Sequence, residues 1–125
     1  MRLAQALLYV TDLPRMEAFY AGELGLPLRA REPGFVQLGA DGGVLALHVI
    51  PPAYAPAITT PPVAREDGTI KLGFDVDDVA AVRARLVAAG HAMREPWRHV
   101  DLLVCDGLDP EGNVFQLRSR VAPAT

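Results

Sequence analysis

The sequence predicts an α+β fold made of two βαβββ modules, and internal repetition is the main observation behind this prediction. Residues 3–25 (LAQALLYVTDLPRMEAFYAGELG) and residues 70–90 (IKLGFDVDDVAAVRARLVAAG) both have the pattern of a strand, an aspartate and an amphipathic helix that ends in glycine. The closing segments of the two halves, residues 43–48 and 113–118, are also similar. Because self-similarity along a chain indicates repeated structural units, we expect two copies of one structural plan.

The composition fits one compact domain over residues 1–125 and excludes several classes of partner. Half of the 125 residues are hydrophobic, and the formal net charge is −3. An acidic chain of this kind lacks the clustered cations that bind nucleic acid, and it has no apolar run long enough to span a membrane. Cys105, the single cysteine, allows no internal disulfide and fits a reducing compartment. We therefore expect a cytoplasmic protein that binds neither nucleic acid nor membranes.

The first half, residues 1–50, is expected to contain one helix and four strands. Asp12 is placed to cap the helix, and Pro14 is tolerated in its first turn. Apolar residues at helical spacing predict its buried stripe: Leu13, Met16, Tyr20 and Leu24. Apolar segments bounded by glycine-containing turns predict the strands: residues 3–10, 28–31, 35–38 and 44–50.

The second half, residues 70–120, repeats this plan. Asp77 or Asp78 is expected to cap its helix. The buried stripe of the helix is predicted from the same spacing: Val79, Val82, Leu86 and Ala89. Strands are predicted over residues 70–76, 91–94, 101–105 and 113–118, with a tight turn at residues 109–113 (DPEGN).

Residues 51–69 form a proline-rich linker between the two modules. Proline lacks a backbone N–H and disrupts helices and central strands, so the segment is expected to be neither. It is either a simple connection or a lid or dimer strap, since long loops without secondary structure often carry function.

Five short motifs occur in order between residues 2 and 120: VTDL (10–13), FY (19–20), LGL (24–26), DPEGN (109–113) and FQL (115–117). At this spacing they resemble the vicinal oxygen chelate superfamily, which includes glyoxalase I, the bleomycin-resistance proteins and the extradiol dioxygenases. The resemblance implies that the modules form a glyoxalase-like open barrel, a cup for a small-molecule ligand, and that the protein is a homodimer.

The resemblance also implies where relatives hold a divalent metal, on the first and last strand of each half. Those positions are Gln5, Ala46, Lys71 and Gln116 here. Divalent metals need imidazole, carboxylate or thiolate donors, whereas Ala46 has none and the Lys71 ammonium repels a cation. No cofactor is therefore expected, and a divalent metal is disfavoured.

Strand side chains alternate in direction, so His48 points the same way as Ala46. The candidate ligand-binding residues are Gln5, His48, Lys71, Gln116, Trp97 and Tyr54. Lys71 and His48 are also the candidate catalytic residues. Lys71 either binds an anionic group, acts as a base or nucleophile, or pairs with Asp75, Asp101 or solvent. His48 is a general base, a substitute metal ligand or a hydrogen-bonded sheet residue.

Two main functions fit this sequence, and a third interpretation is an accessory module in which the cup is empty and dimerisation is the function. The first is a glyoxalase- or bleomycin-resistance-like protein with a degenerate metal site, which sequesters an antibiotic or another small ligand. The alternative is an enzyme, either a lyase or isomerase of the glyoxalase type or a dioxygenase-like enzyme, which uses a divalent metal or Lys71 and His48.

Overall fold

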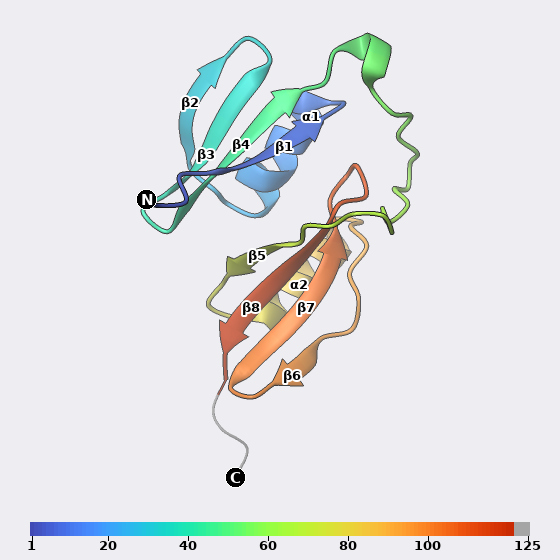
Figure 1. The fold of residues 1–125 in the computed structure, drawn as a ribbon. Coiled ribbons are helices and arrows are strands. Elements are labelled where there is room, and N and C mark those ends of the chain that lie inside the picture. Colours follow the sequence, from blue (N-terminus) through green and yellow to red (C-terminus); the bar gives the residue numbers. More distant parts are fainter. Residues whose placement is uncertain (122–125) are drawn as a thin grey trace. The chain divides into compact units, whose positions relative to one another are not determined.

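The computed structural model describes residues 1–121 and shows two compact units, residues 1–59 and residues 60–121 (Figure 1). Each unit contains a four-stranded mixed sheet with helical structure on one face. The element order is βαβββ in each unit, so the predicted α+β repeat is confirmed. Within residues 1–121, no helix is long and apolar enough to cross a membrane.

The first unit is built on the sheet order β1-β4-β3-β2, with β1 parallel to β4 and the other neighbours antiparallel. Its elements are β1 (Ala6–Val10), α1 (Leu13–Glu17), η1 (Ala18–Glu23), β2 (Leu28–Glu32), β3 (Phe35–Ala40) and β4 (Gly43–Val49). Strand β1 thus begins three residues later than predicted.

The helix of this unit is capped as predicted, but its buried residues differ from the predicted stripe, since Leu13 and Leu24 are only half-buried. The Asp12 carboxylate accepts a hydrogen bond from the backbone N–H of Arg15 at 3.1 Å. The segment η1 continues α1 as a wider π-helix, in which the adjacent residues Phe19 and Tyr20 are both buried. An ideal α-helical period places only Tyr20 on the buried face, so Phe19 was not predicted there.

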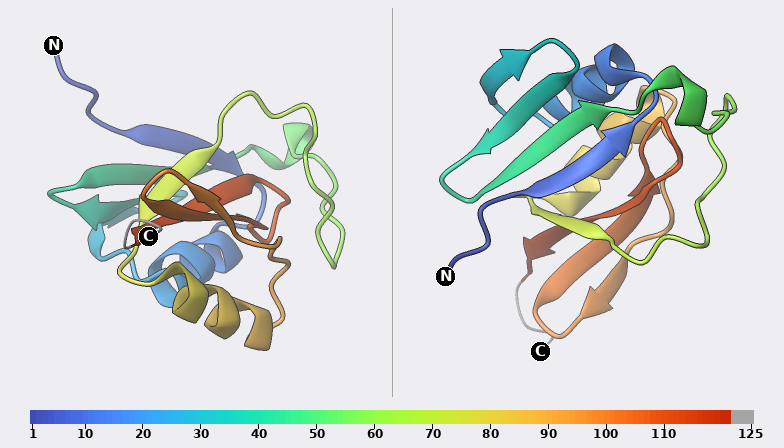
Figure 2. Two further views of the ribbon diagram at one scale, coloured as in Figure 1. Left: turned by 90° about the horizontal axis from the view of Figure 1, so that it is seen from below. Right: turned by 45° about the horizontal axis from the view of Figure 1, so that its top comes forward.

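The second unit has the equivalent sheet order β5-β8-β7-β6, with β5 parallel to β8. Its elements are β5 (Leu72–Asp75), α2 (Val79–Ala88), β6 (Trp97–His99), β7 (Leu102–Leu108) and β8 (Val114–Arg120). Figure 2 shows α2 along one face of this sheet, where it packs on β7 and β8. We call the opposite sheet face, to which Gln116 and Asp106 belong, the open face.

Asp78 is the cap of α2, since its carboxylate accepts from the backbone N–H of Ala81 at 3.1 Å. Val79 and Leu86 are fully buried, as predicted. Ala89 is exposed, so the prediction that it belongs to the buried stripe is wrong. It lies at the C-terminal cap, where the helix has already left the sheet.

The strand predicted over residues 91–94 is also wrong. Only Met93 makes an isolated bridge there, to Gly107, and the strand of this region is β6 further along. The backbone N–H of His91 instead donates to Leu86 O, which closes the end of α2. The segment does contact β7, through hydrogen bonds from Leu108 N to Ala92 O and from Arg94 N to Asp106 O, but the pairing is limited to this one bridge.

The linker contains one regular element, the 3₁₀ turn η2 (Pro52–Tyr54). As predicted, no longer helix and no strand occurs between Val49 and Leu72 in the described chain. Residues 60–69 belong to the second unit, where they pass beside the turn between β7 and β8.

Candidate ligand-binding site

Asp106 on β7 is the centre of a polar cluster on the open face of the second unit. Asp106 is only 6% exposed. Lys71 Nζ donates to Asp106 Oδ2 at 3.1 Å, and Gln116 Nε2 donates to Oδ1 at 3.2 Å. Arg94 Nη1 lies 3.9 Å from the same Oδ2. Two cations therefore share one buried carboxylate, which leaves a formal positive charge in excess.

The strand register explains how these side chains meet. Asp106 pairs directly with Gln116 across β7 and β8, and Gln116 pairs with Gly73 on β5. Directly paired residues share a sheet face, and their side chains are close neighbours. Lys71, which directly precedes β5, reaches the Asp106 carboxylate on this face. The predicted pairing of Lys71 with Asp75 or Asp101 is wrong, since those carboxylates pair with Arg118 and Arg120.

Arg94 is positioned through its backbone. Its N–H donates to Asp106 O at 2.9 Å. Its carbonyl accepts from Arg83 Nε at 2.9 Å and from the thiol of Cys105 at 3.2 Å. Burial raises the pKa of the Cys105 thiol, against a smaller opposing effect of Arg83, so the thiol remains protonated and able to donate. These contacts from α2 and β7 fix the point from which the Arg94 side chain extends.

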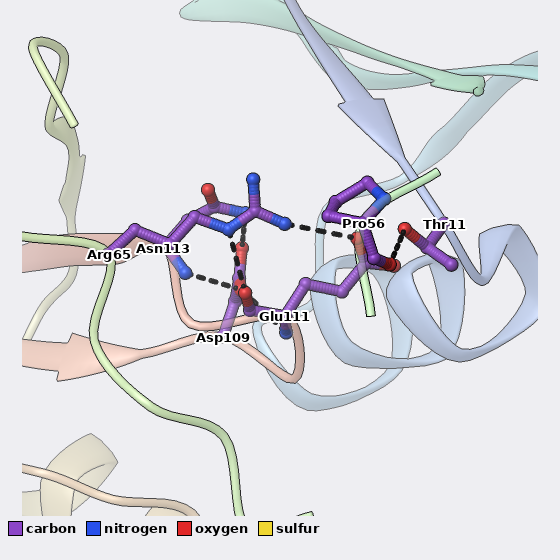
Figure 3. A network of polar contacts seen from close by, with 6 residues as sticks. All are labelled: Thr11, Pro56, Arg65, Asp109, Glu111 and Asn113. Carbon is purple, nitrogen blue, oxygen red and sulfur yellow. Dashed lines mark hydrogen bonds and ion pairs between the residues drawn. The ribbon is translucent and has the colours of Figure 1, made fainter. Parts of the chain in front are cut away.

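A third cation reaches this part of the unit from the linker. Arg65 donates its backbone N–H to Gly112 O at 2.9 Å and its Nε to Glu111 O at 3.0 Å (Figure 3). Its Nη2 lies 3.8 Å from the Glu111 carboxylate, which is almost completely buried. The segment Val63–Arg65, which we call the strap, is thereby fastened to the β7–β8 turn.

The turn that receives the strap is ordered by Asp109, as the DPEGN motif predicted. The buried Asp109 carboxylate accepts from the backbone N–H groups of Glu111 and Asn113 at 2.9 and 3.0 Å (Figure 3). It also accepts from Asn113 Nδ2 at 2.8 Å. Gly112 has a φ of +85°, and a Cβ there would lie 2.1 Å from Val63 O. Only glycine therefore allows both the turn and the close approach of the strap.

The three cations line a pocket of about 280 Å³ within the second unit. Its wall is formed by residues that precede β5, by Arg94 between α2 and β6, and by the start of β8. The residues of this basic pocket are Arg65, Glu66, Gly68, Thr69, Ile70, Lys71, Arg94, Asn113 and Val114. Of the residues predicted as ligand-binding, only Lys71 belongs to it.

The first unit presents a different open face. The rings of Tyr9, His48 and Phe35 form a row across three strands, with centroid distances of 5.7 and 6.0 Å between neighbours. His48 Nδ1 lies 2.8 Å from Val49 O. Because a carbonyl can only accept, this contact assigns the proton to Nδ1 and leaves Nε2 of the neutral ring as an acceptor. His48 is exposed, so this acceptor can meet a ligand.

An amide pair in the first unit corresponds to the ion pair of the second. Gln37 Nε2 donates to Gln5 Oε1 at 3.0 Å, and Gln37 pairs with Ala46 in the sheet. Gln5, Gln37 and Ala46 thus take the places that Lys71, Asp106 and Gln116 take in the second unit. The same geometry is neutral in one unit and ionic in the other.

The aromatic residues predicted as ligand walls lie on different elements. Trp97 is 43% exposed on β6, where it pairs with Val104. Tyr54 is 80% exposed in η2 of the other unit. Neither lines the basic pocket.

The four positions implied for a metal do not provide a suitable set of donors. Ala46 has no donor atom, and Lys71 contributes a positive charge. Gln116 directs its amide nitrogen, not its oxygen, into the polar cluster. In the described part of the chain, no three His, Cys, Asp or Glu residues are grouped to hold a metal ion. These residues do not fit a divalent metal.

Sequence reasoning missed Asp106, Arg94 and Arg65. The signal for Asp106 was the length of the hairpin, because a turn at residues 109–113 places Asp106 opposite Gln116. Because the strand was predicted to end at Cys105, Asp106 was not recognised as a strand residue. Arg94 and Arg65 had no local signal, since each depends on a backbone contact with a distant segment.

Comparison with protein families gives a match over residues 2–117 to the Glyoxalase/Bleomycin resistance protein/Dioxygenase superfamily. The chain belongs to this superfamily. The glyoxalase-like character inferred from its motifs is thereby confirmed. Comparison with curated protein sequences found no match.

Solved structures of the glyoxalase superfamily are similar along nearly the whole chain. A glyoxalase/dioxygenase from Nostoc punctiforme has a TM-score of 0.79 at 19% identity, covering 97% of this chain and 92% of that one. TnmS3, an antibiotic binding protein from Streptomyces sp. CB03234, has a TM-score of 0.70 at 26% identity, with coverages of 96% and 97%. Lactoylglutathione lyase from Agrobacterium tumefaciens has a TM-score of 0.67 at 23% identity, with coverages of 94% and 92%. The first and third show the shared fold alone.

Proposed function

We propose that this protein binds and sequesters a small molecule without a metal ion. The observation that carries the proposal is the Lys71–Asp106 ion pair, because the resemblance to metal-using relatives implies a metal ligand at the position of Lys71. An ammonium group in that place opposes a divalent cation and offers hydrogen-bond donors instead. The adjacent basic pocket provides the space for a ligand group. The similarity to TnmS3, an antibiotic binding protein, supports this function.

The chemistry of the polar cluster favours binding over catalysis. Lys71 is an ammonium group held by a carboxylate, so it has no lone pair with which to act as a base or nucleophile. Cys105 is fully buried, and its raised pKa keeps it from forming a thiolate. The polar cluster therefore supplies charges and hydrogen bonds for recognition, and neither Lys71 nor Cys105 is an activated nucleophile.

The test is a thermal-shift screen of antibiotics and small metabolites against protein treated with EDTA. A true ligand at about 100 times its Kd should stabilise the folded protein by about 2.7 kcal/mol, because it binds the folded state alone. Mass spectrometry of the bound compound should then recover it unchanged. Conversion of the compound to a product would show that the protein is an enzyme and contradict the proposal.

A glyoxalase-type lyase or isomerase activity is the second candidate, and His48 favours it. Its Nε2 is an exposed acceptor with the ring held by Val49 O, which is the arrangement of a general base. If this role is correct, His48→Ala abolishes turnover of a substrate found in the screen, while His48→Gln does not restore it. Full activity of the His48→Ala variant would exclude His48 as the general base.

We also propose that the protein is a homodimer, as the resemblance to its superfamily implies. Light scattering during size-exclusion chromatography should give twice the 13.4 kDa mass of one chain. A mass of one chain at micromolar concentration would contradict the dimer.

A further inference from the structure

We propose that the basic pocket is an oxyanion site, which takes the carboxylate, phosphate or phosphonate group of a small molecule. This inference rests on the proposed function, since it names the chemical class of the ligand. It follows from the position of three cations on one pocket wall and from the carboxylates that hold them.

The cations face the pocket, whereas their carboxylate partners lie behind them. Lys71 and Arg94 line the pocket, but Asp106, which pairs with both, is 6% exposed and does not line it. Arg65 lines it as well, and its partner Glu111 is 3% exposed. Each buried carboxylate therefore fixes a cation from one side and leaves the other side to a ligand.

Several donors of these cations remain unused in the described chain. Lys71 has three N–H donors, and one of them contacts Asp106. Arg94 approaches the same carboxylate only at 3.9 Å, and its side chain is 54% exposed. Arg65 is already held by Glu111, since its Nε donates to the backbone O at 3.0 Å and its buried Nη2 lies 3.8 Å from the carboxylate. An oxyanion in the pocket would give Lys71 and Arg94 the acceptors that they lack.

The neutral groups of the wall agree with this assignment. Thr69 and Asn113 add a hydroxyl and an amide to the lining. Glu66 is the single carboxylate that lines the pocket, and it is exposed at the rim. The buried Asp106 and Glu111 carboxylates balance the remaining charge of the three cations, so the wall attracts an anion through the exposed donors of Lys71 and Arg94 and not through a net charge.

The strap brings a residue of the linker to the pocket of the second unit. Arg65 reaches the pocket because Val63–Arg65 is fastened to the β7–β8 turn through Gly112 O and Glu111 O. The linker therefore supplies a ligand-contacting residue, in addition to connecting the two units. Figure 3 shows Arg65 beside Glu111 and the turn.

The experiment is a titration of the full chain with inorganic phosphate and, separately, with acetate, followed by ¹⁵N NMR. Phosphate should shift the amides of residues 65–71, 94 and 113–114, with roughly millimolar affinity because so small a ligand makes few contacts. Arg94→Gln should weaken phosphate binding about tenfold through loss of a charged donor. Acetate binding the same amides would extend the site to carboxylates, while phosphate alone would restrict it to phosphate-type groups.

The matched control is Arg29→Gln, which removes the same charge from the exposed strand β2 of the first unit. It should leave phosphate affinity unchanged. Equal weakening in both variants would mean that phosphate responds only to net charge, and would overturn the site. Shifts scattered outside the named amides would overturn it as well.

The outcomes also separate this inference from the proposed function. If a neutral compound from the screen binds with the same affinity to Arg94→Gln and to the native protein, the oxyanion site is wrong and the binding function stands. If phosphate binds as described but no compound in the screen binds, the oxyanion site stands and sequestration is contradicted.

Discussion

Replacing Gly112 with alanine should destabilise the second unit by about 2–4 kcal/mol and weaken oxyanion binding in the same variant. The new Cβ would lie 2.1 Å from Val63 O, and the backbone at this position has a φ of +85°. The chain must therefore either strain the turn or release the strap. Releasing the strap breaks the hydrogen bond from Arg65 N to Gly112 O and withdraws Arg65 from the pocket.

Urea denaturation followed by Trp97 fluorescence measures this effect, because the single tryptophan lies on β6 of the second unit. Gly42→Ala is the control, since Gly42 is also in a turn but a Cβ there meets nothing within 4 Å. A Gly112→Ala protein as stable as the native one, with phosphate affinity unchanged, would show that the strap does not build the site.

The second large effect is on phosphate affinity, which substitutions of Lys71 and of Asp106 should change in opposite directions. Lys71→Met should weaken phosphate binding at least about tenfold, since it removes a cation from the pocket wall. Asp106→Asn should strengthen it about fivefold, because the amide keeps the shape but removes the charge that neutralises Lys71 and Arg94. Calorimetric titration of both variants measures the two directions.

The free energy of unfolding tests the same ion pair independently of ligand binding. Lys71→Met leaves the buried Asp106 carboxylate with Gln116 and a cation 3.9 Å away, which should cost about 1–2 kcal/mol. The figure is below that of a fully buried pair because the Lys71 side chain is 43% exposed. The double variant Lys71→Met/Asp106→Asn should recover most of this loss. If both single variants shift phosphate affinity in the same direction, the ion pair does not set the charge of the pocket.

The sequence carried enough information for the fold because its signals are local. The aspartate caps at Asp12 and Asp78 and the turn at Asp109 each depend on residues within a few positions, and all three form as expected. The repeat itself set the equivalence of Gln5 and Lys71, and the structure gives both side chains corresponding partners.

The site was less predictable because its contacts depend on distant segments. Asp106-Gly107 has the composition of a turn, yet both residues lie inside β7. Gly107 is needed in the strand because a Cβ there would lie 2.3 Å from Met93 Sδ and 2.9 Å from the Phe115 ring. Tertiary packing thus decides where the strand ends, and with it whether Asp106 lies opposite Gln116. Arg94 and Arg65 are then placed by backbone bonds to that strand and to the following turn.

The central claim is that ligand binding needs no metal ion, and calorimetry on metal-stripped protein tests it most directly. A compound identified in the screen is titrated into the EDTA-treated protein and then into protein supplied with zinc, nickel, manganese or ferrous iron, with elemental analysis of each sample. The account predicts the same Kd throughout and no stoichiometric metal, because Gln5, Ala46, Lys71 and Gln116 do not fit a divalent ion. One metal equivalent per chain, together with tighter ligand binding, would contradict it.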